Sequence, residues 1–338
     1  MKAAIFYGKN DIRVEEKEIR APLKDEVVVK IAYCGICGTD LHIFHGDEGS
    51  AETVPPLVLG HEMSGTIVQT GEDVTRFSVG DRVCIDPNSY CGECYYCRSG
   101  MEHFCSEMMG VGTTVDGGFA EYCTLPANMI LHIPDSLSLR AAAFSEPLAC
   151  CLHGIDLTKI TVGSRVLVIG GGTIGLLMVQ LSKLAGASWI TLVEPDPEKR
   201  KLSESMGADE VYESGESLLK ALQEDPQKRV DRVIECVGKT ETISCALEAA
   251  SKGATVMMFG LTPPKAELII RPFEIFKKEL NITASFVNPL TQARAVELLA
   301  SGRVSVDGLI SAEIPLEKLS EALTEPKYRL MKKILVKI

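Results

Sequence analysis

Residues 165–175 read Arg-Val-Leu-Val-Ile-Gly-Gly-Gly-Thr-Ile-Gly, an apolar run followed by a G-x-G-x-x-G pattern. The apolar run predicts a buried strand, and the glycines fall between this strand and an expected helix. In that context Gly170 permits a tight turn, Gly172 lets the backbone approach a pyrophosphate, and Gly175 allows the helix to pack closely on the strand. The stretch, with Ile174 inside the motif, therefore predicts a dinucleotide site.

The next expected strand, from Trp189 to Glu194, ends in an acidic residue. A carboxylate at this place accepts hydrogen bonds from the adenosine ribose and repels a 2'-phosphate, so we expect NAD rather than NADP. Lys199 and Arg200 follow on an expected helix. Taken alone they form an ordinary solvated helix face, and a place for Lys199 near the ribose is what the family resemblance given below implies.

The pattern of expected strands and helices changes twice along the chain, once before the glycine motif and once after it. Between residues 153 and 288, continuous apolar strands alternate with helical segments, which predicts a doubly wound parallel sheet covered on both faces. Residues 1–152 show short, glycine-punctuated strands, and residues 289–338 end in one more helix and a strand. We therefore expect an α/β protein of two domains, with residues 153–288 inserted into a β-rich domain made of residues 1–152 and 289–338.

The composition fits a globular protein and limits its partners. Among 338 residues, 46% are hydrophobic and 24% are charged, and the net charge is -11. No basic block stands out, so nucleic acid and anionic membrane are not expected partners. Neither a signal peptide nor a membrane span is recognisable, which predicts a cytoplasmic protein. Twelve cysteines are then expected to be reduced or metal-bound rather than paired in disulfides.

Four of these cysteines form a C-x2-C-x2-C-x7-C array, namely Cys91, Cys94, Cys97 and Cys105. Four thiolates can close a tetrahedron around zinc with no open position, which makes such a site structural. An iron-sulfur cluster is disfavoured because no proline follows the last cysteine and a second closely spaced half is absent. Four free buried thiols are implausible because this short loop offers little core.

A second constellation lies upstream. It comprises Cys34-Gly-Ile-Cys37-Gly-Thr39-Asp40-Leu-His42, then Gly60-His61-Glu62-x-x-Gly65-x-x-Val68-x-x-Gly71, and finally Gly80-Asp81-Arg82-Val83. Taken alone, Cys34 and Cys37 look like a zinc knuckle, and His61 could be a hydrogen-bonded core residue. Together the motifs resemble the signature of zinc-containing medium-chain alcohol dehydrogenases, and the resemblance covers essentially the whole chain. It implies a GroES-like catalytic domain joined to a Rossmann NAD-binding domain, with two zinc ions per chain.

The resemblance also implies roles for individual residues. Cys37, His61 and Glu62 correspond to the catalytic zinc site, and Glu146 in Ser-Glu-Pro-Leu is a third or water-linked ligand. Cys34 then has no ligand role. Glutamate at position 146 is typical of the polyol branch, which includes sorbitol and L-iditol dehydrogenases, whereas ethanol-type members have cysteine. A thiolate, an imidazole and carboxylates leave positions open for water or substrate, as a catalytic zinc requires.

Further roles follow from the same resemblance. Thr39 and His42 correspond to a proton relay, and histidine suits it because imidazole changes charge near neutral pH; His42 could instead be an ordinary surface residue. Asp40 is expected to orient His61 or to cap a helix. The nicotinamide half is expected to lie along five residues, which are Phe259, Gly260, Leu261, Phe286 and Val287.

Three positions depart from the animal sorbitol dehydrogenases. Those enzymes have Arg-Tyr where this chain has Val287-Asn288, and a tyrosine where it has Ile43. The groups that would anchor a polyol therefore differ, and the substrate stays open.

The resulting hypothesis is oxidation of a secondary alcohol to a ketone with NAD, on a polyol such as sorbitol, xylitol or arabinitol. Threonine, 2,3-butanediol and sugar-alcohol phosphates are the alternatives within the enzyme class. A non-catalytic NAD-binding sensor is the alternative outside it, although the complete ligand set argues against that. The resemblance further implies a homo-oligomer, either a dimer or a tetramer.

Overall fold

The computed structural model of the protein describes residues 1–47, 52–225 and 227–338. The chain forms two compact units, one of Met1–Ala149 with Val287–Ile338 and one of Cys150–Phe286. From the sequence we expect the chain to pass from one domain to the other after residues 152 and 288. Both positions lie within three residues of the boundaries between the two units, which follow Ala149 and Phe286. The first of these boundaries falls inside helix α4 (Ser145–Thr158), so the first residues of this helix belong to one unit and the rest to the other. No helix in the described part of the chain is long and apolar enough to cross a bilayer.

The second unit contains the predicted parallel sheet, and the sequence-based expectation of its type is confirmed. Its six strands are β11 (Arg165–Ile169), β12 (Trp189–Val193), β13 (Glu210–Tyr212), β14 (Arg232–Glu235), β15 (Thr255–Met258) and β16 (Asn281–Ala284). Every neighbouring pair is parallel, and the order is β13-β12-β11-β14-β15-β16. Numbered within the sheet this order is 3-2-1-4-5-6, the Rossmann arrangement, with the reversal beside β11.

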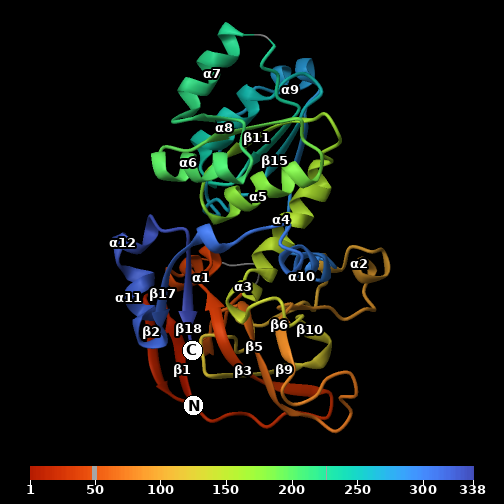
Figure 1. The fold of residues 1–338 in the computed structure, drawn as a ribbon, viewed down its shortest axis with the longest axis vertical. Coiled ribbons are helices and arrows are strands. Elements are labelled where there is room, and N and C mark those ends of the chain that lie inside the picture. The colour runs from red at the N-terminus through yellow and green to blue at the C-terminus, as the bar shows by residue number, and fades with distance from the viewer. Residues whose placement is uncertain (48–51, 226) are drawn as a thin grey trace. The chain divides into compact units, whose positions relative to one another are not determined.

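Helices cover this sheet (Figure 1). They are α5 (Thr173–Leu184), α6 (Pro197–Met206), α7 (Gly215–Glu224), α8 (Thr240–Ala249) and α9 (Pro272–Lys278). Helix α5 packs on β11 and β12 directly after the glycine motif, and α7 and α8 pack on each other. The strand residues Leu167, Val168 and Val233 are fully buried, as continuous apolar runs between two helical layers require.

The first unit is β-rich. Its strands are β1 (Lys2–Gly8), β2 (Asp11–Glu16), β3 (Glu26–Gly35), β4 (Leu57–Val58), β5 (Glu62–Thr70), β6 (Arg82–Ile85), β7 (Asn88–Ser89), β8 (Met109–Gly110), β9 (Tyr122–Pro126), β10 (Ile130–His132), β17 (Ile310–Pro315) and β18 (Lys333–Lys337). Its α-helices, besides the start of α4, are α1 (Gly38–Phe44), α2 (Tyr95–Arg98), α3 (Leu139–Ala142), α10 (Gln292–Ala300), α11 (Leu319–Thr324) and α12 (Pro326–Arg329), and η1 (Glu102–Phe104) is a short 3₁₀ turn. The apolar residues Val27, Val29 and Ile31 of β3 are buried in its core, as their alternation predicts.

The main sheet of this unit runs β10-β6-β5-β3-β18-β17, and β9 also pairs with β3. Strand β3 is therefore flanked by β5 on one edge and β18 on the other, and both pairings are antiparallel. The register places Gly35 at the end of β3 opposite Glu62. A Cβ atom added to Gly35 would lie 2.1 Å from Glu62 Oε2, so glycine leaves room for this carboxylate. The sheet thus brings the first residues of β5 and β18 to the same place.

Candidate metal centres and nucleotide site

The cysteine array forms one compact group. Cys94 is the N-cap of α2, Cys97 lies within α2, and Cys105 follows the η1 turn. The Cys91 sulfur lies 3.9 Å from that of Cys97 and 3.5 Å from that of Cys105. Backbone N–H groups point at the sulfurs, and that of Cys97 lowers the pKa of the Cys94 thiol, whereas burial raises the pKa of the Cys97 thiol. Such contacts favour thiolate, the form that binds metal.

This geometry fits a zinc ion. Sulfurs placed 2.3 Å from a tetrahedral zinc are about 3.8 Å from one another, which matches the separations in the loop. All four sulfurs lie within 4.8 Å of one another. The four donors fill every position of the tetrahedron and leave none for substrate, so the group is suited to holding the loop rather than to chemistry.

Cys37, His61 and Glu62 form a second group among the described residues, with one ligand atom from each inside the same 4.8 Å limit. Cys37 is the N-cap of α1, and His61 directly precedes β5. His61 and Glu62 are 6% and 1% exposed. A soft thiolate, an imidazole and a hard carboxylate leave part of a zinc coordination shell open, so this donor set fits a catalytic metal rather than a closed one.

The buried side chain of Asp40 lies beside two members of this group, Cys37 and His61. Its Oδ2 accepts a hydrogen bond from the Cys37 backbone N–H at 2.8 Å, and its Oδ1 lies 3.6 Å from His61 Nδ1. The capping role of Asp40 is therefore present, whereas its predicted role in orienting His61 stays a prediction, because 3.6 Å is too long for a hydrogen bond. Burial raises the pKa of Asp40. Burial lowers the pKa of His61, but the charges of Asp40 and Cys37 outweigh this and raise it.

Lys333 completes the group, and sequence reasoning missed it. It is the first residue of β18 and only 5% exposed. Its Nζ donates to Glu62 Oε1 at 2.7 Å, to Glu62 Oε2 at 2.5 Å and to the Ile36 carbonyl at 3.0 Å. Burial lowers the pKa of Lys333, but the charges of Glu62 and Cys37 raise it above its ordinary value. Glu62 thus has a buried cation as a partner, and a metal would have to share this carboxylate with it.

Glu146 lies in the first turn of α4 and is 7% exposed. It is outside the group of atoms that meet within 4.8 Å among the described residues. It is still close enough for its charge to raise the pKa of both His61 and Lys333. This placement is compatible with a ligand that acts through a water molecule as well as with one that moves onto the metal.

Thr39 and His42 lie on the same short helix, α1. The Thr39 hydroxyl is 3.7 Å from the Cys37 sulfur. The side chain of His42 is 25% exposed, and its Nδ1 lies 3.4 Å from Asp47 Oδ2. The hydroxyl therefore borders the group of metal donors, and the imidazole reaches solvent beside a carboxylate.

The glycine motif lies at the carboxyl end of β11, where a nucleotide is expected. Gly170 has a φ of 103°, and a Cβ at Gly175 would lie 1.7 Å from the Gly170 carbonyl oxygen. Gly172 is the N-cap of α5, and Ile174 lies in its first turn. Only glycine permits this conformation and this close approach, which leaves the amides at the helix start facing outward.

Glu194 follows β12 and is 7% exposed. Its Oε2 accepts from the Gly171 N–H at 2.7 Å, and its Oε1 accepts from the Asp196 N–H at 2.9 Å. Lys199 is half-buried in the first turn of α6, and Arg200 donates from its guanidinium to the carbonyls of Glu194 and Pro195. The Glu194 carboxylate is thereby fixed against the glycine loop, and the Arg200 guanidinium is bound to the backbone of the same segment.

The remaining expected cofactor residues fall in both units. Phe259, Gly260 and Leu261 follow β15, and Phe286 follows β16, all in the second unit. Val287 belongs to the first unit and has a φ of 50°, which is rare for a β-branched residue. The next residue, Asn288, is fully buried and bound to other side chains of the first unit, so it is not presented to a substrate.

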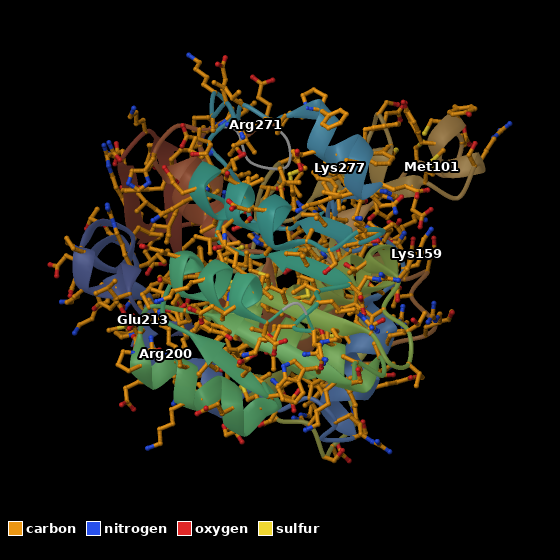
Figure 2. All side chains as sticks on the ribbon, turned by 90° about the horizontal axis from the view of Figure 1, so that it is seen from above. Met101, Lys159, Arg200, Glu213, Arg271 and Lys277 are labelled. Carbon is orange, nitrogen blue, oxygen red and sulfur yellow. The ribbon has the colours of Figure 1, made fainter. Side chains whose placement is uncertain are left out.

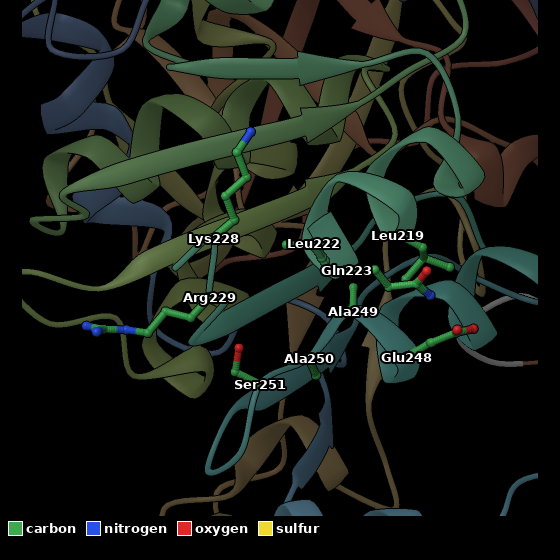
Figure 3. Close-up of a pocket in the computed structure, with 9 residues that line it drawn as sticks. All are labelled: Leu219, Leu222, Gln223, Lys228, Arg229, Glu248, Ala249, Ala250 and Ser251. Carbon is green, nitrogen blue, oxygen red and sulfur yellow. The ribbon is translucent and has the colours of Figure 1, made fainter. Parts of the chain in front are cut away.

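Two hollows lie between α7 and α8. The larger, of about 710 Å³, is lined by the last residues of β11 and β12, Ile169 and Val193, and by the first turns of both helices. The smaller, of about 330 Å³, lies toward the other end of the helices, beside Leu222 and Ala249 (Figure 3). The charged ends of Lys228 and Arg229 point away from this second hollow. Only the larger hollow adjoins the expected nucleotide site.

Comparisons with known proteins agree with this geometry. Residues 23–135 match a family model described as an alcohol dehydrogenase GroES-like domain, and residues 173–301 match one described as a zinc-binding dehydrogenase. The chain is 33% identical over 340 residues to D-arabinitol dehydrogenase 1 from Uromyces fabae. This match covers 99% of this chain and 96% of the relative. It is 32% identical over 329 residues to sorbitol dehydrogenase from Bacillus subtilis (strain 168), with 96% and 92% covered.

Solved structures are similar over the whole length, and one of them serves as an example. It is a protein described as a zinc-binding dehydrogenase from Sinorhizobium meliloti 1021, solved bound to NADP. The TM-score is 0.95 at 38% identity, and the match covers 100% of this chain and 99% of that one.

Proposed function

The chain belongs to the zinc-containing medium-chain alcohol dehydrogenase family, in its polyol and alcohol branch, and from this premise we propose that it oxidises a secondary hydroxyl of a polyol to a ketone with NAD as the hydride acceptor. Sorbitol, xylitol and arabinitol are the polyols we favour. In this proposal the first unit is the catalytic domain, and the second unit binds the dinucleotide.

One observation carries the proposal, namely the meeting of Cys37, His61 and Glu62 in a group that leaves coordination positions open. When bound there, zinc would acidify a coordinated hydroxyl group. Cys37 and His61 would hold the ion, and Asp40 would keep the imidazole in its orientation. Glu62 would neutralise the site together with Lys333, and Glu146 would ligate directly or through water.

We assign the path of the alcohol proton to Thr39 and His42. The Thr39 hydroxyl borders the donor group, so it can accept a proton from a substrate hydroxyl and pass it on toward the cofactor ribose. His42 lies at the solvent side of the same helix, where an imidazole can release the proton. Asp47 Oδ2 lies 3.4 Å from the Nδ1 of this imidazole.

NAD is proposed rather than NADP because of Glu194. Its carboxylate is fixed against the glycine loop at the place where the ribose binds in this fold, and a 2'-phosphate would be repelled there. The pyrophosphate would be held by the glycine motif, that is, by Gly170, Gly172, Ile174 and Gly175. The larger hollow between α7 and α8, which Val193 helps to line, would receive the adenine. Lys199 would approach the ribose. Phe259, Gly260, Leu261, Phe286 and Val287 are proposed for the nicotinamide half.

A coenzyme and substrate screen tests this proposal. NADH or NADPH formation is followed with sorbitol, xylitol, arabinitol, galactitol, a phosphorylated sugar alcohol, threonine and 2,3-butanediol. We expect a polyol with NAD to give the highest kcat/KM. An equal or higher value with NADP would contradict the role of Glu194, and a higher value with threonine or with the phosphorylated substrate would contradict the substrate class.

Matched variants sharpen the coenzyme test. Glu194→Ala removes the repelling carboxylate, so the preference for NAD over NADP should fall by about tenfold, equivalent to ~1.4 kcal/mol. Arg200→Ala is the control because it removes a neighbouring cation and leaves the carboxylate in place. It should not lower the preference for NAD.

A second copy of the chain is the partner we propose for the edge of the parallel sheet. Strand β16 pairs with β15 on one side, and no described strand covers its other side. Exposed apolar residues gather in this part of the second unit, including Ile269 at 96%, Phe273 at 67% and Phe276 at 79%. The last two belong to α9, and Figure 2 labels Arg271, which directly precedes this helix, and Lys277, which lies near its end. An open edge beside apolar surface favours strand pairing between copies.

Light scattering on the purified protein tests the partner. We expect a dimer or a larger even assembly, and Phe273→Glu with Phe276→Glu should shift it toward the monomer. A monomer at micromolar concentration, or an oligomer untouched by both substitutions, would contradict this interface.

A further inference from the structure

Five polar residues from three distant segments of the chain form one hydrogen-bonded cluster in the first unit, and three of them are buried. They are Asp86, Asn88, Ser145, Asn288 and Gln292. Ser145, Asn288 and Gln292 are 1%, 0% and 2% exposed. Buried polar side chains at this depth are costly unless their hydrogen-bonding groups are used, so the bonds within the cluster decide what it can do.

The two amides in the middle of the cluster use all of their hydrogens. Asn288 Nδ2 donates to Asp86 Oδ1 at 3.2 Å and to Gln292 Oε1 at 3.3 Å, and Asn288 Oδ1 accepts from Asn88 Nδ2 at 2.6 Å. Gln292 Nε2 donates to Ser145 Oγ at 2.9 Å and to the Ile85 carbonyl at 3.0 Å. Because both hydrogens of each of these two buried amides are used, their arrangement is strongly restricted, and they hold the residues that they bind in place relative to each other.

One end of this network lies beside the cysteine loop, and the other lies beside Glu146, whose charge acts on His61. At one end, Asn88 begins β7, three residues before Cys91. At the other end, Ser145 is the first residue of α4 and immediately precedes Glu146. The bond that Gln292 donates to Ser145 therefore fixes the start of the helix that carries Glu146, and the bond that Asn288 accepts from Asn88 fixes the start of the cysteine loop.

We propose that Asn288 and Gln292 are positioning residues that couple the Cys91–Cys105 loop to the placement of Glu146 beside Cys37 and His61. The inference rests on the metal site of the proposed function. Neither amide touches the donor group or a substrate. They act through Ser145, and a disturbance at the cysteine loop reaches Glu146 through Asn88, Asn288 and Gln292 in turn.

Cobalt(II) in place of zinc gives a readout that a merely structural role would not move. Tetrahedral cobalt absorbs in the visible, and its bands differ between a four-thiolate set and a set of mixed donors. In Gln292→Leu we expect the mixed-donor band to change while the four-thiolate band stays as in the unsubstituted protein. Cobalt should leave the mixed site for a chelator about tenfold faster, the lower end of what loss of an outer-shell partner costs. The kcat should fall while the KM for NAD stays unchanged.

Gln180→Leu is the matched control. Gln180 is also a buried glutamine, 8% exposed, but it lies in α5 of the second unit. It should cost stability without changing either cobalt band. If Gln292→Leu gives the same spectra and release rates as the control, the inference is overturned. If Gln292→Leu does not fold, Asn288→Ser, which truncates the same network, is measured in its place.

Coupling is tested by a double-mutant cycle. Asn88→Ala should change the mixed-donor band in the same direction as Gln292→Leu, and the effects of the two substitutions should be non-additive. Additive effects would contradict a single network. Absence of a mixed-donor cobalt band in the unsubstituted protein would contradict the proposed function itself, which separates the two failures.

Discussion

The two metal-binding groups of the first unit differ in how their donors are gathered. Cys91, Cys94, Cys97 and Cys105 lie in one short loop and offer four identical donors. Cys37, His61 and Glu62 come from α1 and the start of β5, and Lys333 reaches Glu62 across 271 residues of sequence. The local group is closed and suited to stabilising a loop. The assembled group has mixed donors and a competing cation, so its coordination can change, and this difference separates a structural site from a chemical one.

The substitution Cys37→Ala should have the largest effect on activity. It removes the one thiolate of the assembled group, and loss of a metal that stabilises charge is worth several kcal/mol, on the order of a thousandfold in kcat. The thermal midpoint should change little because the four-cysteine loop keeps its metal. Steady-state kinetics and a thermal melt on the same sample check both statements. Retained activity would contradict the comparison.

The substitution Lys333→Met tests whether the cation belongs to the assembled group. It leaves the Glu62 carboxylate buried without its partner, and breaking such a pair costs about 3 to 5 kcal/mol. Urea unfolding of the metal-free protein measures this loss. The double variant Lys333→Met/Glu62→Gln is the control, because removing both charges should restore much of the stability. If the double variant is as unstable as the single one, the loss is not electrostatic.

The substitution Cys94→Ala should act on stability rather than on chemistry. A metal that closes the 15-residue loop from Cys91 to Cys105 constrains the unfolded chain much as a disulfide does, which is worth about 3 kcal/mol. We expect a loss of this size in the free energy of unfolding, together with one metal ion. The KM for the alcohol should stay within about twofold, a shift of ~0.4 kcal/mol. If Cys94→Ala lowered kcat as much as Cys37→Ala, the four-cysteine group would not be purely structural, and the distinction between the two groups would be wrong.

The smallest effect is a pH dependence at the start of the cysteine loop. Burial raises the pKa of Asp86 to about 6. The folded state then binds this proton more tightly than the unfolded state, where the pKa is near 3.9. The contribution of Asp86 to stability should therefore fall as pH rises from about 4 to about 6, by at most ~1.4 kcal/mol per unit. Unfolding of the protein and of Asp86→Asn at matched pH values isolates this slope, and parallel curves would contradict it.

The sequence predicts local features well and long-range contacts poorly. The glycine motif with its strand and helix, the parallel sheet and the cysteine loop all depend on residues close in sequence, and each is present as expected. The short strands β13 and β16 were not predicted. The first has three residues, and the second is a largely exposed edge without a buried apolar run.

Lys333 shows why part of the site could not be predicted. The closing strand contains Lys333 and Lys337, which lie on the same face by the two-residue period of a strand. One is 5% exposed and paired with Glu62, and the other is exposed. Only the register of β18 on β3 and of β3 on β5 tells them apart. The same limit applies to Asn288 and Gln292, whose bonds to Asn88 and Ser145 span 200 and 147 residues of sequence.

Zinc content per chain tests the central claim most directly, because the account depends on two sites with different donors. Atomic absorption on the purified protein should give two zinc ions per chain, and Cys37→Ala should give one, with an unchanged thermal midpoint. A single zinc ion in the unsubstituted protein, with none lost on Cys37→Ala, would contradict the account.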